Sequence, residues 1–276
     1  MTLNNRSKYG AVSRTSAGIP IFDSGAFEAM HIAGRVAAEV LDEITPLVVE
    51  NVTTGEIDDA VMAMIRQRGA IPASLGYKGF PCSCCISPNH VVCHGIPGSR
   101  VLRKGDILNI DVAVIVDGWY GDTSRMYAVG RPSVKASRLI KATHEALMLG
   151  IKAVVPGGRF GDIGEAIHSY ADSCGYSVVD MFCGHGLGRV FHDLPAVFHC
   201  REEKETDEIL PGMLFTIEPM INQGQFDVKV LSDGWTAVTK DRSLSAQFEH
   251  SLGVTENGVE IFTKSPASIF FPQNMP

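Results

Sequence analysis

The chain has no long run of basic residues and no apolar segment long enough to cross a membrane. Its 24 lysines and arginines are outnumbered by 31 aspartates and glutamates, which gives a formal net charge of -7. This balance argues against nucleic acid or an anionic membrane as the main partner, and a membrane helix would need roughly 20 consecutive apolar residues. We therefore expect neither partner and a small or peptidic substrate.

The sequence also has no N-terminal apolar stretch that resembles a signal peptide, and its seven cysteines are an odd number. Both features favour a reducing cytoplasm. Cys82, Cys84 and Cys85 are close in sequence, which raises structural zinc as an alternative. No second Cys or His pair stands at zinc-finger spacing from them, so the sequence favours ordinary thiols.

The first 20 residues contain no acidic residue but include Arg6, Lys8 and Arg14. This composition predicts a flexible N-terminal extension, followed by a single domain over residues 21–276. An organelle transit peptide has a similar basic and hydroxyl-rich composition, so it stays open as an alternative.

Two pairs of segments repeat at nearly the same spacing. GDILNID at 105–111 matches GMLFTIE at 212–218, and GEIDDAV at 55–61 matches GDIGEAI at 161–167. The period is far longer than the ~20 to 50 residues of stacked solenoid repeats. We therefore expect an internal duplication, with half-repeats at about 21–130 and 131–265, that places Asp111 and Glu218 at equivalent points.

Each half is expected to contain two helices followed by apolar strands. A first helix can begin at residue 23 or 24, and Thr53 and Glu56 stand at capping-box spacing ahead of a second. In the second half, one helix follows residue 133 and another covers residues 161–174. This order predicts the α/β class.

A hairpin signal, Asp117–Gly118, separates an apolar β-branched run from its return strand. The turn predicts that Asp111 pairs with Ser124 and that Ala113 pairs with Asp122. Asp111 and Asp122 then share a face as diagonal neighbours within ~7 to 8 Å at the backbone. Two carboxylates this close repel each other, so one takes a proton or a divalent cation lies between them.

The second half supplies further candidate ligands. Glu218 ends an apolar strand, and Glu249 in SAQFEHS aligns with Asp122 after a longer insertion. His185 in GHGLGRVFH lies among glycines that allow close backbone approach. Any one of these residues could instead be solvated or ion-paired, but the duplication favours a two-metal site. Carboxylates with one imidazole suit Mn, Fe(II) or Co(II), with zinc left open.

Six ordered segments are similar to a known family, type I methionine aminopeptidase of peptidase family M24. They are VVCHGIP (91–97), NIDV (109–112), GDTS (121–124), GHGLGRVFH (184–192), TIEPM (216–220) and DRSLSAQFEH (241–250). The similarity covers about residues 25–262. It implies the pita-bread fold, in which two pseudo-twofold half-domains form an antiparallel sheet flanked by helices.

The resemblance also implies roles for individual residues. The dinuclear metal ligands would be Asp111, Asp122, His185, Glu218 and Glu249, with Asp122 and Glu249 bridging both ions. Asp111 would complete one ion, and His185 with Glu218 the other. The catalytic residues would be His94 and His192, which face the substrate, and Glu218, which would also act as general base on the bridging water.

Two further sites are carried over from the family. The methionine pocket maps onto Tyr77, Phe80, Cys85, Phe191 and Trp235, and a monovalent cation onto Asn89, Val91 and Ser245. Phe80 stands where the family often has tyrosine, and Ser74 where it often has cysteine.

The implied activity is removal of the initiator methionine from nascent polypeptides when the second residue is small. Two divalent ions, Mn, Fe(II), Co(II) or Zn, would be required, in a monomeric cytoplasmic enzyme that can contact the ribosome. One alternative is a proline-specific peptidase of the same fold. The other is a metal-free binding protein on the same scaffold.

Overall fold

The computed structural model describes residues 13–202, 206–272 and 275. The helices are α1 (Ser24–Ile44), α2 (Thr54–Gln67), α3 (Val134–Lys152) and α4 (Phe160–Ser173), with short 3₁₀ helices η2 (Thr45–Leu47) and η3 (Tyr77–Gly79). The strands are β1 (Ser13–Arg14), β2 (Pro20–Ile21), β3 (Ile71–Pro72), β4 (Cys85–Pro88), β5 (Val91–Cys93), β6 (Ile107–Val116), β7 (Trp119–Ala128), β8 (Ser177–Val178), β9 (Gly184–Gly186), β10 (Asp193–Val197), β11 (Leu214–Ile217), β12 (Met220–Asn222), β13 (Val228–Val230), β14 (Ala237–Thr239), β15 (Ser245–Gln247), β16 (His250–Thr255) and β17 (Gly258–Ile261).

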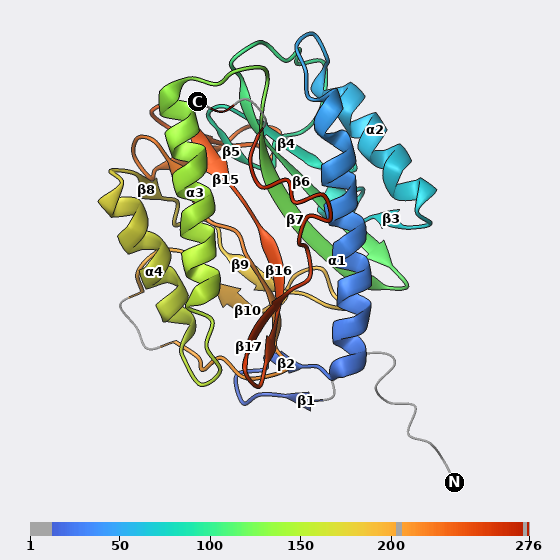
Figure 1. The fold of residues 1–276 in the computed structure, drawn as a ribbon, viewed down its shortest axis with the longest axis vertical. Helices are drawn as coiled ribbons and strands as arrows, with labels where there is room; N and C mark the ends of the chain where they lie inside the picture. The colour runs from blue at the N-terminus through green and yellow to red at the C-terminus, as the bar shows by residue number, and fades with distance from the viewer. Residues whose placement is uncertain (1–12, 203–205, 273–274, 276) are drawn as a thin grey trace.

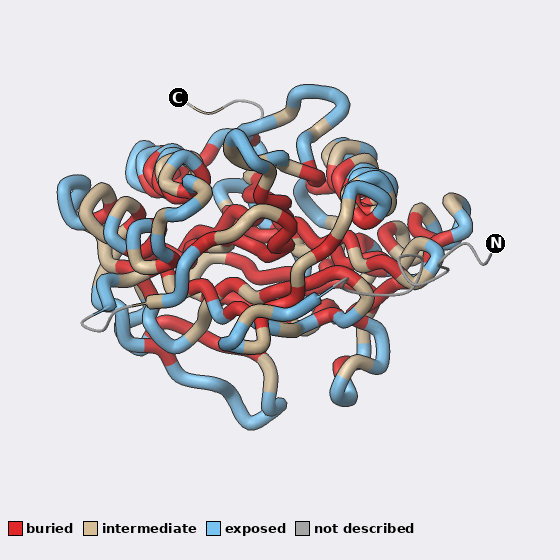
Figure 2. Tube along the Cα trace, turned by 90° about the horizontal axis from the view of Figure 1, so that it is seen from below, coloured by how far each residue is buried: buried red, intermediate tan, exposed pale blue. Residues whose placement is uncertain are grey.

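The four helices lie on one side of the strands, with α1 and α2 beside the first half and α3 and α4 beside the second (Figure 1). Seen from below, the buried strands form a central layer, and the helices turn their buried faces toward it (Figure 2). The helix α1 approaches β7 closely, because a Cβ at Gly121 would overlap the carbonyl oxygen of Ala33. Small residues at this crossing therefore bring the helix layer against the strand that carries Asp122.

The helices begin where the sequence predicts. The Asp23 carboxylate accepts a hydrogen bond from the Ala26 N–H at 3.1 Å, so it caps α1. Thr53 and Glu56 form the expected capping box of α2, in which side chain and backbone satisfy each other's free N–H groups. Ser133 caps α3 in the same way as Asp23 caps α1.

The predicted hairpin register is confirmed. Asp111 pairs with Ser124, and Ala113 pairs with Asp122, in the antiparallel β6–β7 ladder. In the second half, β11 pairs with β16 in an antiparallel arrangement that places Glu218 and Glu249 just beyond the last pair. The β6–β7 pair therefore carries Asp111 and Asp122, and Glu218 and Glu249 lie at the end of the β11–β16 pair.

Hydrogen bonds join the two halves directly at these carboxylates. The Glu249 N–H donates to the Ser124 carbonyl at 3.1 Å, and the Thr123 hydroxyl donates to the Glu249 carbonyl at 2.7 Å. The Ser251 hydroxyl donates to the Asp122 carbonyl at 2.5 Å. The backbones that carry Asp122 and Glu249 are therefore fixed relative to each other.

The expected N-terminal extension overlaps residues 1–12, which lie outside the described residues. Residues 13–20 include β1, which pairs with β2, and Arg14 forms an ion pair with Asp193 at 3.0 Å. The proposed division into an extension, one domain and two half-repeats stays a prediction. None of the helices in the described ranges combines the length and apolar character that crossing a membrane requires.

Candidate metal centre and substrate cavity

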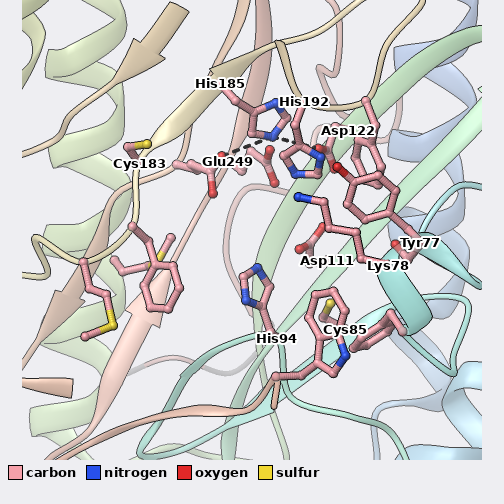
Figure 3. Close-up of a pocket in the computed structure, with 18 residues that line it drawn as sticks. Tyr77, Lys78, Cys85, His94, Asp111, Asp122, Cys183, His185, His192 and Glu249 are labelled. Atoms are coloured by element: carbon pink, nitrogen blue, oxygen red, sulfur yellow. Dashed lines mark ion pairs between the residues drawn. The ribbon is translucent and has the colours of Figure 1, made fainter. Parts of the chain in front are cut away.

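The five predicted metal ligands converge at the junction of the two halves. Asp111 comes from β6, Asp122 from β7, His185 from β9, Glu218 from the end of β11, and Glu249 from the link between β15 and β16. His185 Nε2 lies 3.5 Å from Asp122 Oδ2 and 3.6 Å from Glu218 Oε1. Ligand atoms of Asp122, His185 and Glu249 all lie within 4.8 Å of one another, and Asp111 lines the same cavity (Figure 3).

Two glycines and a backbone carbonyl orient His185. A Cβ at Gly184 or Gly186 would overlap a neighbouring backbone carbonyl, so the predicted close approach around His185 is present. The ring atom Nδ1 lies 3.1 Å from the Gly186 carbonyl oxygen, which can only accept a hydrogen bond. Nδ1 therefore carries a proton, and Nε2 is the nitrogen that faces the carboxylates, as in many metal-binding histidines.

Glu218 is held by three side chains that the sequence analysis did not assign. The Thr216 hydroxyl donates to Glu218 Oε1 at 2.8 Å, and Gln247 Nε2 donates to Glu218 Oε2 at 3.3 Å. The buried His199 accepts the Glu218 N–H through Nε2 at 3.1 Å. Thr216 also accepts the His185 N–H at 3.0 Å, so one hydroxyl links two candidate ligands.

Burial and mutual repulsion disfavour ionisation of these carboxylates in the absence of a cation. Burial, then the charges of Asp122 and Glu218, raises the pKa of Asp111 well above its usual range. The same causes, with Asp111 as a further contributor, raise the pKa of Glu249. For Glu218, burial is the largest cause and raises the pKa to about 7, although His185 acts in the opposite direction. Divalent cations would offset this repulsion, so the donor set fits them.

The same carboxylates predict that metal binding releases protons. At about pH 6, binding of Mn(II) to the metal-free protein should release at least about one proton, because the ions require deprotonated ligands and the pKa of Glu218 is about 7. Proton release should fall, and apparent affinity should rise, as the pH increases past this pKa. Calorimetric titrations in buffers of different ionisation enthalpy measure both quantities. An affinity that is independent of pH, with no proton release, would contradict the assignment.

A cavity of about 310 Å³ opens onto the carboxylates. All five predicted pocket residues line it, namely Tyr77, Phe80, Cys85, Phe191 and Trp235, together with His94 and His192. The rings of Tyr77 and Phe191 meet edge to face at 4.9 Å, as do those of Phe80 and Trp235 at 5.2 Å. The cavity is therefore lined both by aromatic side chains and by carboxylates.

The two predicted catalytic histidines contact these aromatic side chains. His192 stacks on Tyr77 with ring centroids 4.9 Å apart, and His94 packs edge to face against Trp235 at 6.0 Å. Burial, His185 and Lys78 together lower the pKa of His192 to about 3. Burial also lowers the pKa of His94. Both imidazoles are therefore neutral at physiological pH, and each can donate one hydrogen bond.

A model of metallopeptidase family M24 matches residues 28–256 of the chain. The chain belongs to this family. The methionine aminopeptidase of Rickettsia prowazekii (strain Madrid E) is 55% identical to it over 248 residues, which cover 89% of this chain and 95% of that protein. A crystal structure of methionine aminopeptidase from Rickettsia prowazekii matches with a TM-score of 0.88 and 54% identity, and covers 89% of this chain and 99% of that one.

A structure with much lower sequence identity shares the fold. Prolidase from Pyrococcus furiosus matches with a TM-score of 0.73 at 20% identity, over 88% of this chain and 65% of that one. The resemblance to methionine aminopeptidases and the α/β pita-bread fold are thus confirmed. Membership of the M24 metallopeptidases also makes the protein a hydrolase that uses divalent metal ions. The individual ligands and pocket residues stay predictions.

The cysteine cluster has a structural explanation within this M24 fold. Asp58 on α2 accepts hydrogen bonds from the Ser83 N–H at 2.9 Å, the Ser83 hydroxyl at 2.6 Å and the Cys84 N–H at 3.0 Å. Burial raises the pKa of the Cys84 and Cys85 thiols, so they stay protonated in the metal-free protein. Within residues 13–202, 206–272 and 275, the one group of metal-binding side chains that is close enough to hold an ion contains no cysteine.

Proposed function

We propose that this M24 metallopeptidase is a methionyl aminopeptidase that removes the initiator methionine from nascent polypeptides whose second residue is small. The observation that carries the proposal is the convergence of Asp111, Asp122, His185, Glu218 and Glu249 in a cavity that aromatic side chains also line. The first set suits divalent cations, and the second suits an apolar thioether side chain. The similarity to proteins named methionine aminopeptidase supports the same conclusion.

The proposed ligand arrangement is the one that the resemblance to type I methionine aminopeptidases implies. Asp122 and Glu249, fixed to each other through backbone hydrogen bonds, would lie between two ions. Asp111 would complete one ion, and His185 with Glu218 the other. When bound, the two ions activate a water molecule and polarise the scissile carbonyl. Mn, Fe(II), Co(II) and Zn all accept this mixture of carboxylate and imidazole ligands.

The chain's own side chains supply the remaining steps. Glu218, whose pKa is raised to about 7 by burial, is suited to accept the proton of the attacking water. His94 and His192 are neutral and line the cavity, so they can donate hydrogen bonds to the scissile amide. Their N–H groups stabilise the negative charge that develops on the carbonyl oxygen.

The methionine side chain would lie against Tyr77, Phe80, Cys85, Phe191 and Trp235. A thioether packs favourably against aromatic edges, and Cys85 lies directly across from Asp111 in the β4–β6 ladder. This register supports a methionine pocket next to the metal ligands. An N-terminal methionine can thus fill the pocket while its peptide bond reaches the metals.

A monovalent cation site is proposed at Asn89, Val91 and Ser245. The Ser245 N–H donates to the Asn89 carbonyl at 2.9 Å, so these segments are neighbours. The buried Ser245 hydroxyl oxygen has no hydrogen-bond partner in the part of the chain that the structure describes. An oxygen of this kind is suited to a cation or an ordered water.

The cellular setting is also part of the proposal. We infer a monomeric cytoplasmic enzyme that acts on nascent chains and can contact the ribosome. Its net charge of -7 gives no reason to expect nucleic acid as substrate.

Depletion of the protein in its host tests the proposed function. Proteins that begin Met-Ala or Met-Gly should then retain methionine, and mass spectrometry of N-terminal peptides measures the retained fraction. Proteins that begin Met-Lys or Met-Leu are the control, because their methionine should be retained with or without the enzyme. Unchanged processing of the Met-Ala and Met-Gly proteins, in a host without a second such enzyme, would contradict the proposal.

Two alternatives remain testable. A proline-specific peptidase would share the fold, as the Pyrococcus furiosus prolidase does at 20% identity. A metal-free binding protein would need no ligands, whereas all five candidate ligands are present here. Turnover of peptides with methionine at the first position or proline at the second position distinguishes both alternatives from the proposed activity.

A further inference from the structure

Lys78 reaches into the cavity from its exposed rim. The residue lies in η3, between the pocket aromatics Tyr77 and Phe80. It is exposed and yet lines the cavity, and its side chain extends toward His192 and Asp111 (Figure 3). Its backbone has φ of +48° and ψ of 26°, a left-handed conformation that is uncommon for a residue with a side chain. This backbone geometry accompanies a side chain that points inward from a surface turn.

Lys78 is a basic residue in a cavity that is lined by acidic ones. Of the 18 residues that line the cavity, it is the one lysine, with no arginine among them, while four are aspartate or glutamate. Its ammonium lies 5.3 Å from the centroid of the Tyr77 ring. In the described part of the chain it makes no ion pair or hydrogen bond, so it stays available to a group that enters the cavity.

We propose that Lys78 binds an acidic side chain at the third residue of the substrate. This inference rests on the proposed function, in which methionine lies against the aromatic side chains and the second residue is small. The third residue is then the first one after the scissile bond that can carry a long side chain, and the proposal places that side chain at the exposed turn that carries Lys78. Lys78 thereby gives the exposed turn a positive charge that favours an acidic side chain over a basic one.

Two other roles for Lys78 make different predictions. If the Lys78 ammonium only balances the charge of the carboxylates when no metal is bound, replacing Lys78 should change metal affinity but not the preference among substrates. If it binds the C-terminal carboxylate of short peptides, the effect should vanish with amidated peptides. Amidated substrates that differ only at the third residue therefore isolate the proposed contact.

The experiment compares C-terminally amidated Met-Ala-Glu-Ser, Met-Ala-Gln-Ser and Met-Ala-Lys-Ser with the Mn(II)-loaded full chain. Wild-type protein should show kcat/KM about three- to ten-fold higher for the glutamate peptide than for the lysine peptide, as expected for a partly exposed ion pair. Added salt should weaken this preference. Lys78→Gln should bring the ratio to about one, Lys78→Glu should reverse it, and Lys78→Arg should preserve it.

Comparing peptides within each variant cancels any change in overall activity or metal loading. Lys135→Gln, on the exposed face of α3, is the matched control and should keep the wild-type ratio. A wild-type enzyme without preference for glutamate, or an unchanged ratio in Lys78→Gln, would overturn the proposal. Cleavage of Met-Ala-Gln-Ser with neither effect would overturn this inference and leave the proposed function intact. Absence of cleavage of all three peptides would instead overturn the proposed function.

Discussion

Replacing Asp122 or Glu249 by alanine should lower kcat/KM for a Met-Ala peptide by about 10³-fold or more. Metal ions contribute several kcal/mol to stabilising the transition state, and each ~1.4 kcal/mol is tenfold in rate. Both side chains are buried, at 4% and 2% exposure, and lie between the two halves of the chain. Loss of either should therefore disturb both ions rather than one.

Activity and metal content should be measured together on the same preparations. Each alanine variant should bind less than the wild-type amount of metal after dialysis, as measured by elemental analysis. Glu256→Ala, at an exposed position after β16, is the matched control and should keep full activity. Near-normal turnover by Asp122→Ala or Glu249→Ala at saturating metal would exclude them as bridging ligands.

Replacing His192 by alanine should lower kcat by about 10²- to 10⁴-fold and leave metal content unchanged. The ring lines the cavity, stacks on Tyr77, and is neutral because burial, His185 and Lys78 lower its pKa to about 3. A hydrogen bond that strengthens in the transition state affects kcat more than KM. His94→Ala should behave similarly, since His94 lines the same cavity and is also neutral.

The pH dependence of activity distinguishes protonation of His192 from protonation of Glu218. Because the pKa of His192 is about 3, loss of activity on the acid side of neutrality should not reflect its protonation. His31→Ala, at an exposed position on α1 where the ring contacts Glu260, is the control. The contrary result would be that His192→Ala loses metal and that its kcat is normal at saturating metal. His192 would then have a structural role.

The β6–β7 hairpin shows what the sequence could predict. Asp117–Gly118 favours a two-residue turn, and such a turn fixes the register along the whole ladder. That register alone placed Asp111 and Asp122 on one face, and the internal repeat extended the argument to Glu218 and Glu249. Helix starts were predictable for the same reason, because capping contacts at Asp23 and Thr53 are local in sequence.

Contacts between distant segments were not predictable from single motifs. Thr216 lies two residues before Glu218, and Gln247 lies two residues before Glu249. Because side chains two residues apart in a strand point to the same face, this spacing was the one sign in the sequence that they lie together. His199 carried no comparable signal, because its contact with the Glu218 N–H depends on how β10 and β11 pack. The direction of Lys78 depends on the left-handed backbone of a short turn, which the sequence around it did not indicate.

The repeat also explains why the carboxylates are concentrated at one place. Each half contributes a pair of acidic positions, and hydrogen bonds between Thr123, Ser251 and the opposite half bring the pairs together. Buried charge of one sign is costly, so cations bound at these carboxylates would stabilise the folded protein. Most of the aromatic side chains come from other segments, at η3 and between β13 and β14, whereas Phe191 lies in the same segment as His185.

Turnover of Met-Ala-Ser and Ala-Pro-Ser peptides by metal-stripped protein tests the central claim most directly. Mn, Fe(II), Co(II) or Zn would be added back separately under anaerobic conditions. The proposed function predicts no cleavage without metal, and metal-restored cleavage of the methionine peptide alone. Cleavage of the proline peptide would contradict the substrate assignment, and metal binding without cleavage of either peptide would contradict the assignment as an aminopeptidase.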